Sequence, residues 1–139
     1  MPKLALISIT LNTVIFAALL PFLEISTSHL FNPEWPAHAR LHEAWQLSAN
    51  AALSILALVL VFKDRAPRIG MSIALIICFS FLLSWVSAST YGGSMLRSDG
   101  THIAAVGGIN AAVLIVMFLT MFLLLGYRSI ANASRDDGI

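Results

Sequence analysis

Long apolar stretches alternate with short polar segments along the whole chain. The apolar stretches cover residues 4–23, 41–62, 69–91 and 103–127. Each is about as long as the roughly 20 residues that a helix needs to cross the hydrocarbon core of a bilayer. Because they use up most of the 139 residues, the sequence predicts one all-α domain over residues 1–139, an integral membrane bundle of four transmembrane helices.

The first two stretches have informative starts. The first follows a single lysine, is longer than the apolar core of a signal peptide and has no clear small-x-small cleavage site, which predicts a retained helix. The second helix is expected to begin near Trp35-Pro36, because proline suits the first helical position. From Pro36 to Phe62 such a helix is about 40 Å long, so its first turns are expected at the level of the lipid headgroups.

A row of polar residues crosses this second helix at a spacing of four. The row consists of His38, His42, Gln46, Asn50 and Ser54. Residues four apart share a helix face, and strongly polar groups at membrane depth normally face the bundle or a cavity. The row therefore predicts a polar interior or a polar interface between subunits.

Other polar residues recur in the remaining stretches. In the third they follow a helical spacing and comprise Ser80, Ser84, Ser87 and Tyr91. Serines in membrane helices usually bond their own backbone or a neighbouring helix. Asn12 and Asn110 are candidates for interface or cavity contacts, and Gly107-Gly108 for close helix packing.

Composition excludes several classes of function. Of the residues, 58% are apolar and 11% charged, and the net charge is +1, which leaves no basic excess and no recognisable module for binding nucleic acid. The lone cysteine, Cys78, can make no internal disulfide. Nucleic acid is therefore excluded as a partner.

The distribution of positive charge predicts an orientation. Four spans put both termini and the turn between the second and third helices on one side. That side carries Lys3, Lys63, Arg65, Arg68, Arg128 and Arg135, against Arg40 and Arg97 opposite. By the positive-inside rule, the N- and C-termini are cytoplasmic, and all four histidines gather at the other end of the bundle.

Three kinds of site fit these histidines. His38 and His42 on one helix face can hold zinc or non-haem iron, with the remaining ligands drawn from Glu34, Glu43, His29 and His102. A His/Glu pair can act in acid-base catalysis. A haem needs one axial histidine in a largely apolar pocket. Spacing alone does not choose among the three.

Several short motifs stand in an order that resembles the styrene oxide isomerase family, small four-helix bacterial membrane enzymes. They are Leu23-Glu24-Ile25, Pro33-Glu34-Trp35, Ala39-Arg40-Leu41-His42, the hairpin Lys63-Asp64-Arg65-Ala66-Pro67-Arg68-Ile69-Gly70, and Leu125-Gly126-Tyr127-Arg128. The resemblance extends over most of the chain.

This resemblance implies a homotrimer in the bacterial inner membrane that binds haem b between subunits. His42 would be the axial iron ligand, with His38 as the alternative one turn away. The substrate class would be a lipophilic epoxide, which the iron opens as a Lewis acid so that a hydride shift gives a carbonyl compound.

The resemblance also indicates supporting residues. The family's asparagine falls where this chain has Ser48, and Asn50 stands two residues further on, about 80° round the helix from His42. Tyr91 follows Trp85 by six residues, a spacing like the family's. We therefore expect Tyr91 and Asn50 to orient the substrate, and Gln46 and Ser48 to line the cofactor cavity.

Two alternatives stay open. The first is a non-catalytic membrane protein without a cofactor, an accessory subunit or a binder of a lipophilic ligand, whose polar rows only join helices. The second is a metal-dependent enzyme that uses histidine and glutamate at the non-cytoplasmic face. Oligomerisation is expected in any case, because one small bundle can hardly hide all its polar rows.

Overall fold

The structure, a computed structural model, describes residues 1–96 and 104–136, with side chains described through residue 133. It is mostly helical, as predicted, with a short hairpin in addition. In chain order the elements are α1 (Lys3–Val14), the π-helical turn η1 (Ile15–Leu19), α2 (Leu20–Glu24), α3 (Ala37–Phe62), α4 (Pro67–Val86), the 3-10 turn η2 (Ala88–Thr90), the strands β1 (Ala105–Val106) and β2 (Ile109–Asn110), and α5 (Ala111–Asp136).

Four helices in this described part are long and apolar enough to cross a membrane. They cover Lys3–Glu24, Ala37–Phe62, Pro67–Val86 and Ala111–Ala133. The first is one rod made of α1, η1 and α2. Its π turn ends just before Pro21, a residue that has no backbone N–H and whose ring cannot follow the usual helical hydrogen bonding. The proline therefore explains where the regular helix is interrupted.

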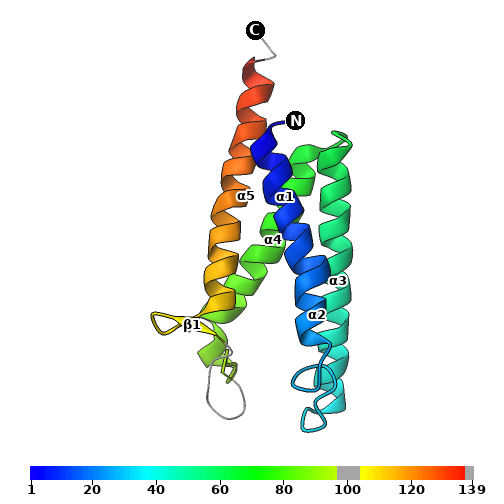
Figure 1. Cartoon of the computed structure of the whole chain (residues 1–139), viewed down its shortest axis with the longest axis vertical. Coiled ribbons are helices and arrows are strands. Elements are labelled where there is room, and N and C mark those ends of the chain that lie inside the picture. Colours follow the sequence, from blue (N-terminus) through cyan, green and yellow to red (C-terminus); the bar gives the residue numbers. More distant parts are fainter. Residues whose placement is uncertain (97–103, 137–139) are drawn as a thin grey trace.

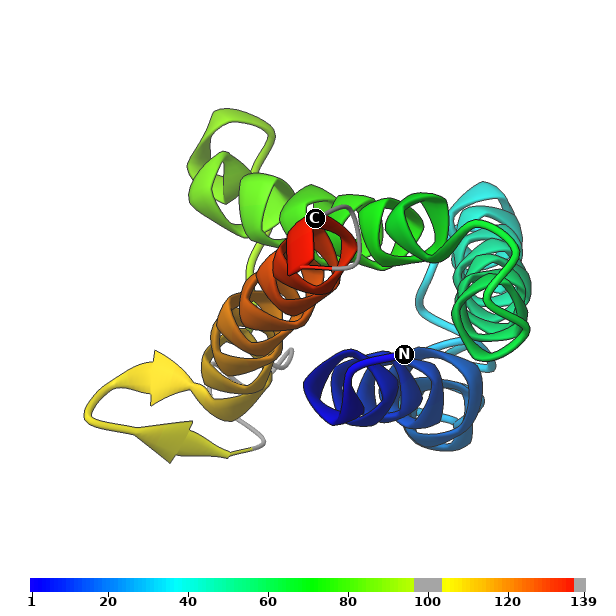
Figure 2. The ribbon, with the colours of Figure 1, turned by 90° about the horizontal axis from the view of Figure 1, so that it is seen from above.

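The four rods form a ring. Helices α3 and α4 pack as an antiparallel hairpin, α4 packs on α5, α5 on α1, and α1 back on α3. Figure 2 shows this four-sided arrangement from above, and Figure 1 shows that both termini and the α3–α4 turn lie at one end of the bundle. The loop after α2, the start of α3, η2 and the β1–β2 hairpin lie at the other end.

Two glycines let the helices approach closely. A Cβ added to Gly70 on α4 would lie 2.6 Å from the carbonyl oxygen of Ala57 on α3. One added to Gly126 on α5 would lie 2.5 Å from Ser8 Oγ and 3.2 Å from Ala5 Cα on α1. Small residues at such crossings allow the backbone-to-backbone contact on which helix packing in membranes depends.

A polar cluster joins three helices inside the ring. Asn12, which is fully buried, donates from Nδ2 to Ser54 Oγ at 3.2 Å, and Thr13 donates to the carbonyl of Ser54 at 3.0 Å. The buried Cys78 thiol on α4 lies 3.8 Å from Asn12 Oδ1. Asn12 is thus an interior link between helices, which corrects the expectation of a contact at a subunit interface or ligand cavity.

The third apolar stretch leaves its helix early. Helix α4 ends at Val86 and not at Tyr91, because a run of Ser and Thr residues follows whose hydroxyls compete for backbone carbonyls. The Ser87 hydroxyl, for example, donates to the carbonyl of Leu83 at 2.7 Å. Gly92, with φ of 72°, then turns the chain away. Tyr91 therefore lies beyond the helix on which it was predicted.

The fourth helix begins later than predicted. Residue 103 lies outside the described residues, and residues 105–110 form the β1–β2 hairpin before α5 starts at Ala111. Gly107 and Gly108 have φ of 59° and 81°, the positive values that a two-residue hairpin turn requires, so they are turn residues and not packing positions. Asn110 caps the helix, since its Oδ1 accepts the Ala112 N–H at 2.9 Å.

Candidate functional site

The polar row on α3 passes from the outside of the bundle to its inside. His38, His42 and Gln46 are exposed, Asn50 is half-buried, and Ser54 is fully buried. Positions four apart drift by about 40° per step round a helix, so the row turns by roughly 160° from its first member to its last. Only its lower half belongs to the interior, and its upper half is an outward face of the chain.

The helix begins close to where the sequence predicts. Pro36 flanks α3 as its N-cap residue, and Ala37 is the first helical residue. The backbone N–H of Arg40 bonds the carbonyl of Pro36 at 3.2 Å. Proline in this position holds the entering chain extended, and this start brings His38 and His42 onto successive turns of one face.

The two imidazoles on this face touch each other. His38 Nε2 and His42 Nε2 lie 3.0 Å apart, with ring centroids at 4.5 Å and planes at 82°. In such a hydrogen bond one ring nitrogen donates and the other accepts, so at least one of the two histidines is neutral. Two nitrogens bound to one metal ion at bond lengths near 2.1 Å are about 3.0 Å apart in an octahedral site and about 3.4 Å apart in the tetrahedral geometry of zinc. The pair thus has the spacing of a two-nitrogen chelate.

Trp45 frames the histidine pair and was missed by the sequence analysis. Its ring centroid lies 5.8 Å from that of His42, with planes tilted by 41°. Trp45 and Leu41 are each about two-thirds exposed, at 66% and 65%. The sequence contains the information needed to find Trp45, because a residue three positions after His42 shares its helix face. The face combines metal-binding nitrogens with an apolar, flat surface.

The amides below the histidines have no partner in the described part of the chain. No hydrogen bond involves the side chain of Gln46 or Asn50 there, although both lie within a helix apolar enough to cross a membrane. Unsatisfied polar groups at membrane depth cost several kcal/mol each, about the value of a lost hydrogen bond in an apolar medium. We therefore expect a bound ligand or a second copy of the chain to provide hydrogen-bond partners for these two amides.

Ser48 has a different role. Its hydroxyl donates to the carbonyl of Ala44, with a second contact of 3.3 Å to the carbonyl of Trp45. Serine in a helix commonly bonds the carbonyl four residues back. Because this bond occupies the only hydroxyl proton of Ser48, the side chain can offer a lone pair to a cofactor but not a donor.

Tyr91 lies away from the histidine pair within one chain. It follows η2, and the views of Figures 1 and 2 agree that η2 and the first turns of α3 lie at the same end of the bundle on different sides. The Tyr91 hydroxyl donates to the carbonyl of Ser84 at 2.7 Å, and the residue is exposed. One chain thus brings His42 and Asn50 onto a common helix but does not bring Tyr91 to them.

The remaining acids and histidines do not complete a metal shell. Glu24 Oε2 lies 3.3 Å from His29 Nε2, and the edge of His29 packs on Trp35 at 5.9 Å. The backbone N–H of Glu34 bonds Asn32 in the loop, and His102 lies outside the described residues. Across residues 1–96 and 104–133, no three His, Cys, Asp or Glu side chains gather closely enough to share an ion.

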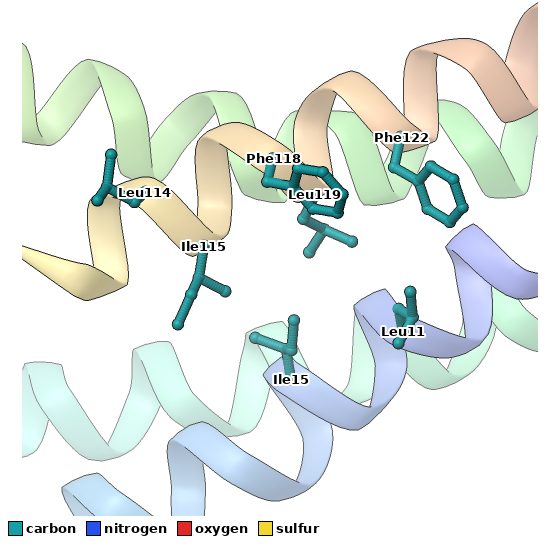
Figure 3. A pocket seen from close by; sticks show the side chains of 7 residues that line it. All are labelled: Leu11, Ile15, Leu114, Ile115, Phe118, Leu119 and Phe122. Atoms are coloured by element: carbon teal, nitrogen blue, oxygen red, sulfur yellow. The ribbon is translucent and has the colours of Figure 1, made fainter. Parts of the chain in front are cut away.

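A separate apolar groove opens between α1 and α5. It has a volume of about 380 Å³ and is lined by Leu11, Ile15, Leu114, Ile115, Phe118, Leu119 and Phe122. Figure 3 shows these side chains facing one another across the two helices. The rings of Phe118 and Phe122 are nearly parallel, 6.1 Å apart. Its lining offers no reactive group, so the groove suits only an apolar ligand and the histidine face remains the better candidate for chemistry.

Comparisons with known proteins add no information on the histidine face. No protein-family model, no curated protein and no solved structure matches the chain. The resemblance to the styrene oxide isomerase family therefore stays a prediction, carried by the short motifs alone.

Proposed function

We propose that the chain is a haem-binding membrane protein that isomerises a lipophilic epoxide to a carbonyl compound. The class of reaction comes from the resemblance to the styrene oxide isomerase family. The observation that supports a cofactor is the outward face of α3, where the exposed His42 stands beside Trp45. The same helix carries the amides of Gln46 and Asn50, which have no partner among the residues that the structure describes. A ligand bound to this face would satisfy groups that the chain itself leaves open.

The donor set of the face suits haem b. Haem b would need only one nitrogen ligand from the protein, which His42 would supply, with His38 as the alternative. Trp45 and Leu41 add exposed apolar surface for the flat ring. When bound, ferric haem supplies a Lewis acid that polarises the epoxide oxygen. The chain contributes the rest.

Each neighbouring side chain then has a defined task. The contact between His38 and His42 uses Nε2 of both rings, so iron held by Nε2 of one histidine would replace this hydrogen bond, whereas iron held by Nδ1 would leave it in place. Gln46 and Asn50 have free amide N–H groups that can donate to an oxygen bearing developing negative charge.

We further propose that the site is completed by a second copy of the chain. The exposed part of the polar row lies on α3, whereas Ser80, Ser84 and Tyr91 are exposed on and after α4. Two different outward faces that meet on successive copies generate a ring when the rotation from one copy to the next closes. Such contacts would bring Tyr91 of one copy toward the α3 face of the next, and the family resemblance implies a trimer.

The same proposal includes a location. Four helices are apolar enough to cross a membrane, and lysine and arginine favour the end that holds both termini. We therefore propose insertion in the bacterial inner membrane with cytoplasmic termini and with the histidine face near the opposite surface. A substrate that dissolves in lipid would reach this face from the membrane.

An absorption spectrum tests the cofactor. The chain is expressed with ample haem, purified in detergent and compared with His42→Ala, His38→Ala and His29→Ala. We expect a Soret band in the parent and in His29→Ala, whose histidine pairs with Glu24 and not with His38 or His42, and no band in His42→Ala. Loss of the band in His38→Ala alone would transfer the ligand role to His38, and a flat parent spectrum would refute haem binding.

Turnover tests the reaction. Haem-loaded protein is incubated with styrene oxide, and the aldehyde is measured by gas chromatography against heat-treated protein and free haem. We expect an aldehyde formed without any added reductant or oxidant, because the isomerisation involves no net redox change. Haem binding without turnover of styrene oxide or longer aryl and alkyl epoxides would keep the cofactor and refute the epoxide reaction.

A second candidate is a metal enzyme without haem, and the histidine pair specifically favours it. The 3.0 Å separation of the two Nε2 atoms suits neighbouring ligands of an octahedral iron, and a small widening to about 3.4 Å would suit tetrahedral zinc, with further donors from another copy. Elemental analysis of protein lacking a Soret band would then find a stoichiometric metal that both His38→Ala and His42→Ala remove. A protein with neither haem nor metal would leave the non-catalytic binder.

A further inference from the structure

A group of cations surrounds the turn between α3 and α4. Lys63, Arg65 and Arg68 are all exposed, and Asp64, also exposed, is the acid within the turn. None of the three cationic side chains is paired with a carboxylate or a carbonyl in the part of the chain that the structure describes. The turn therefore presents unneutralised positive charge, although the net charge of the whole chain is only +1.

A cleft next to these cations has one charged and several apolar walls. It has a volume of about 310 Å³ and is lined by Ala66, Pro67, Arg68, Ile69 and Ile130. Arg68 contributes the charge, while Ile69 is 59% exposed beside it. The cleft thus lies between the first turn of α4 and the later part of α5, and it pairs a guanidinium with an aliphatic surface.

The position of the cleft along the bundle indicates which ligand could use a guanidinium next to an aliphatic surface. Helix α3 ends at Phe62 and α4 begins at Pro67, so the cleft lies where two helices would emerge from the hydrocarbon, at the depth of the lipid phosphates. The N-cap residue of α4, Ala66, has no side chain that could bond the N–H groups of the first turn. These groups add to the positive potential of the helix end.

We propose that this cleft binds an anionic phospholipid. Arg68, helped by Lys63 and Arg65, holds the phosphate of the headgroup, and one acyl chain runs along the exposed Ile69. Three cations against one acid favour a lipid with net negative charge over a zwitterionic one. The proposal requires that the chain spans a membrane, but it is independent of haem and of the epoxide reaction.

Lipid binding by the intact purified protein tests the proposal. Native mass spectrometry in detergent follows the binding of dioleoyl phosphatidylglycerol and of dioleoyl phosphatidylcholine, which share their acyl chains and differ in charge. We expect at least tenfold tighter binding of the anionic lipid. Arg68→Gln should weaken that binding about fivefold, the effect of one basic residue near an anionic headgroup. Equal affinities for the two lipids would overturn the proposal.

Three further arms make the result specific. Arg40→Gln removes the same charge at the opposite end of the bundle and should leave lipid binding unchanged; an equal loss in this variant would refute a localised site. Arg68→Lys should restore most of the affinity, which excludes misfolding as the cause. Excess inorganic phosphate should not displace the lipid, because the apolar wall contributes; displacement would mean a site for free anions. Haem loading is measured on the same samples, so failure of either proposal is seen separately.

Discussion

Replacing Gly70 by alanine should separate the α3–α4 hairpin. The added Cβ would meet the carbonyl oxygen of Ala57 at 2.6 Å and a methyl group of Val61 at 2.9 Å. The first of these atoms is backbone and cannot rotate away. Overpacking a well-packed interior costs about 1–3 kcal/mol, and a rigid contact belongs at the upper end of that range. Alanine recovers about 1 kcal/mol as a better helix former than glycine, which leaves a net loss of about 2 kcal/mol.

Gly126→Ala is the matched control, because it adds the same methyl group at another helix crossing. Its two shortest contacts are side-chain atoms. Ser8 Oγ, at 2.5 Å, can move by giving up its bond to the Ala5 carbonyl, and the flexible end of Met71 lies at 2.9 Å; the nearest backbone atom is 3.2 Å away. The strain and the gain in helix propensity should nearly cancel, to within about 1 kcal/mol. Reversible unfolding in mixed detergent, followed by circular dichroism, measures both. A Gly70→Ala protein as stable as the parent, or less affected than Gly126→Ala, would refute this reasoning.

Three further substitutions test other parts of the structure by the same unfolding assay. Asn12→Ala breaks the buried bond to Ser54 and should cost about 1 kcal/mol, and a double-mutant cycle with Ser54→Ala should give a coupling near 0.6 kcal/mol; zero coupling would contradict the bond. Asn110→Ala removes the cap of α5 and should cost about 1 kcal/mol, while Asn110→Asp should retain most of the stability. Tyr91→Phe loses only an exposed hydrogen bond to Ser84, so stability should fall by less than about 1.5 kcal/mol. A much larger fall in turnover than in stability would assign Tyr91 to the reaction.

The number and order of the helices follow from apolar length, and this is why the sequence predicts them. Whether a segment can cross a membrane depends on the summed hydrophobicity of about twenty residues, so one polar residue within it does not change the prediction. The ends of the helices depend on individual residues and are harder to predict. The early end of α4 comes from the Ser-Thr run before Tyr91, and the late start of α5 from the positive φ of Gly107 and Gly108. Both features are visible in the sequence, but the apolar stretches around them predict a longer helix in each case.

Some features of the candidate site could be predicted from the sequence and others could not. That His38 and His42 share a face follows from helical spacing, and their contact at 3.0 Å agrees with it. Whether the face points inward or outward depends on which neighbours pack against α3, and spacing within one helix does not contain this information. The same limit applies to Asn12 and Asn50, which are chemically alike. Asn12 meets Ser54 across the helix interface, whereas Asn50 finds no partner in the described part of the chain.

The drift of the α3 row has a consequence for function. A polar row that followed the helix period exactly would lie wholly in the core or wholly on the surface. A row in the core would join helices, and a row on the surface of the bundle would contact solvent. This row does both, since Ser54 supports the α1–α3 contact while His38, His42 and Gln46 remain exposed. Packing of a single chain accounts for the inner part only. The outer part, with two imidazoles and the Gln46 amide, which has no partner in the described part of the chain, persists at a stability cost in any apolar surrounding. We therefore infer that a bound group or a second copy satisfies it in the working protein.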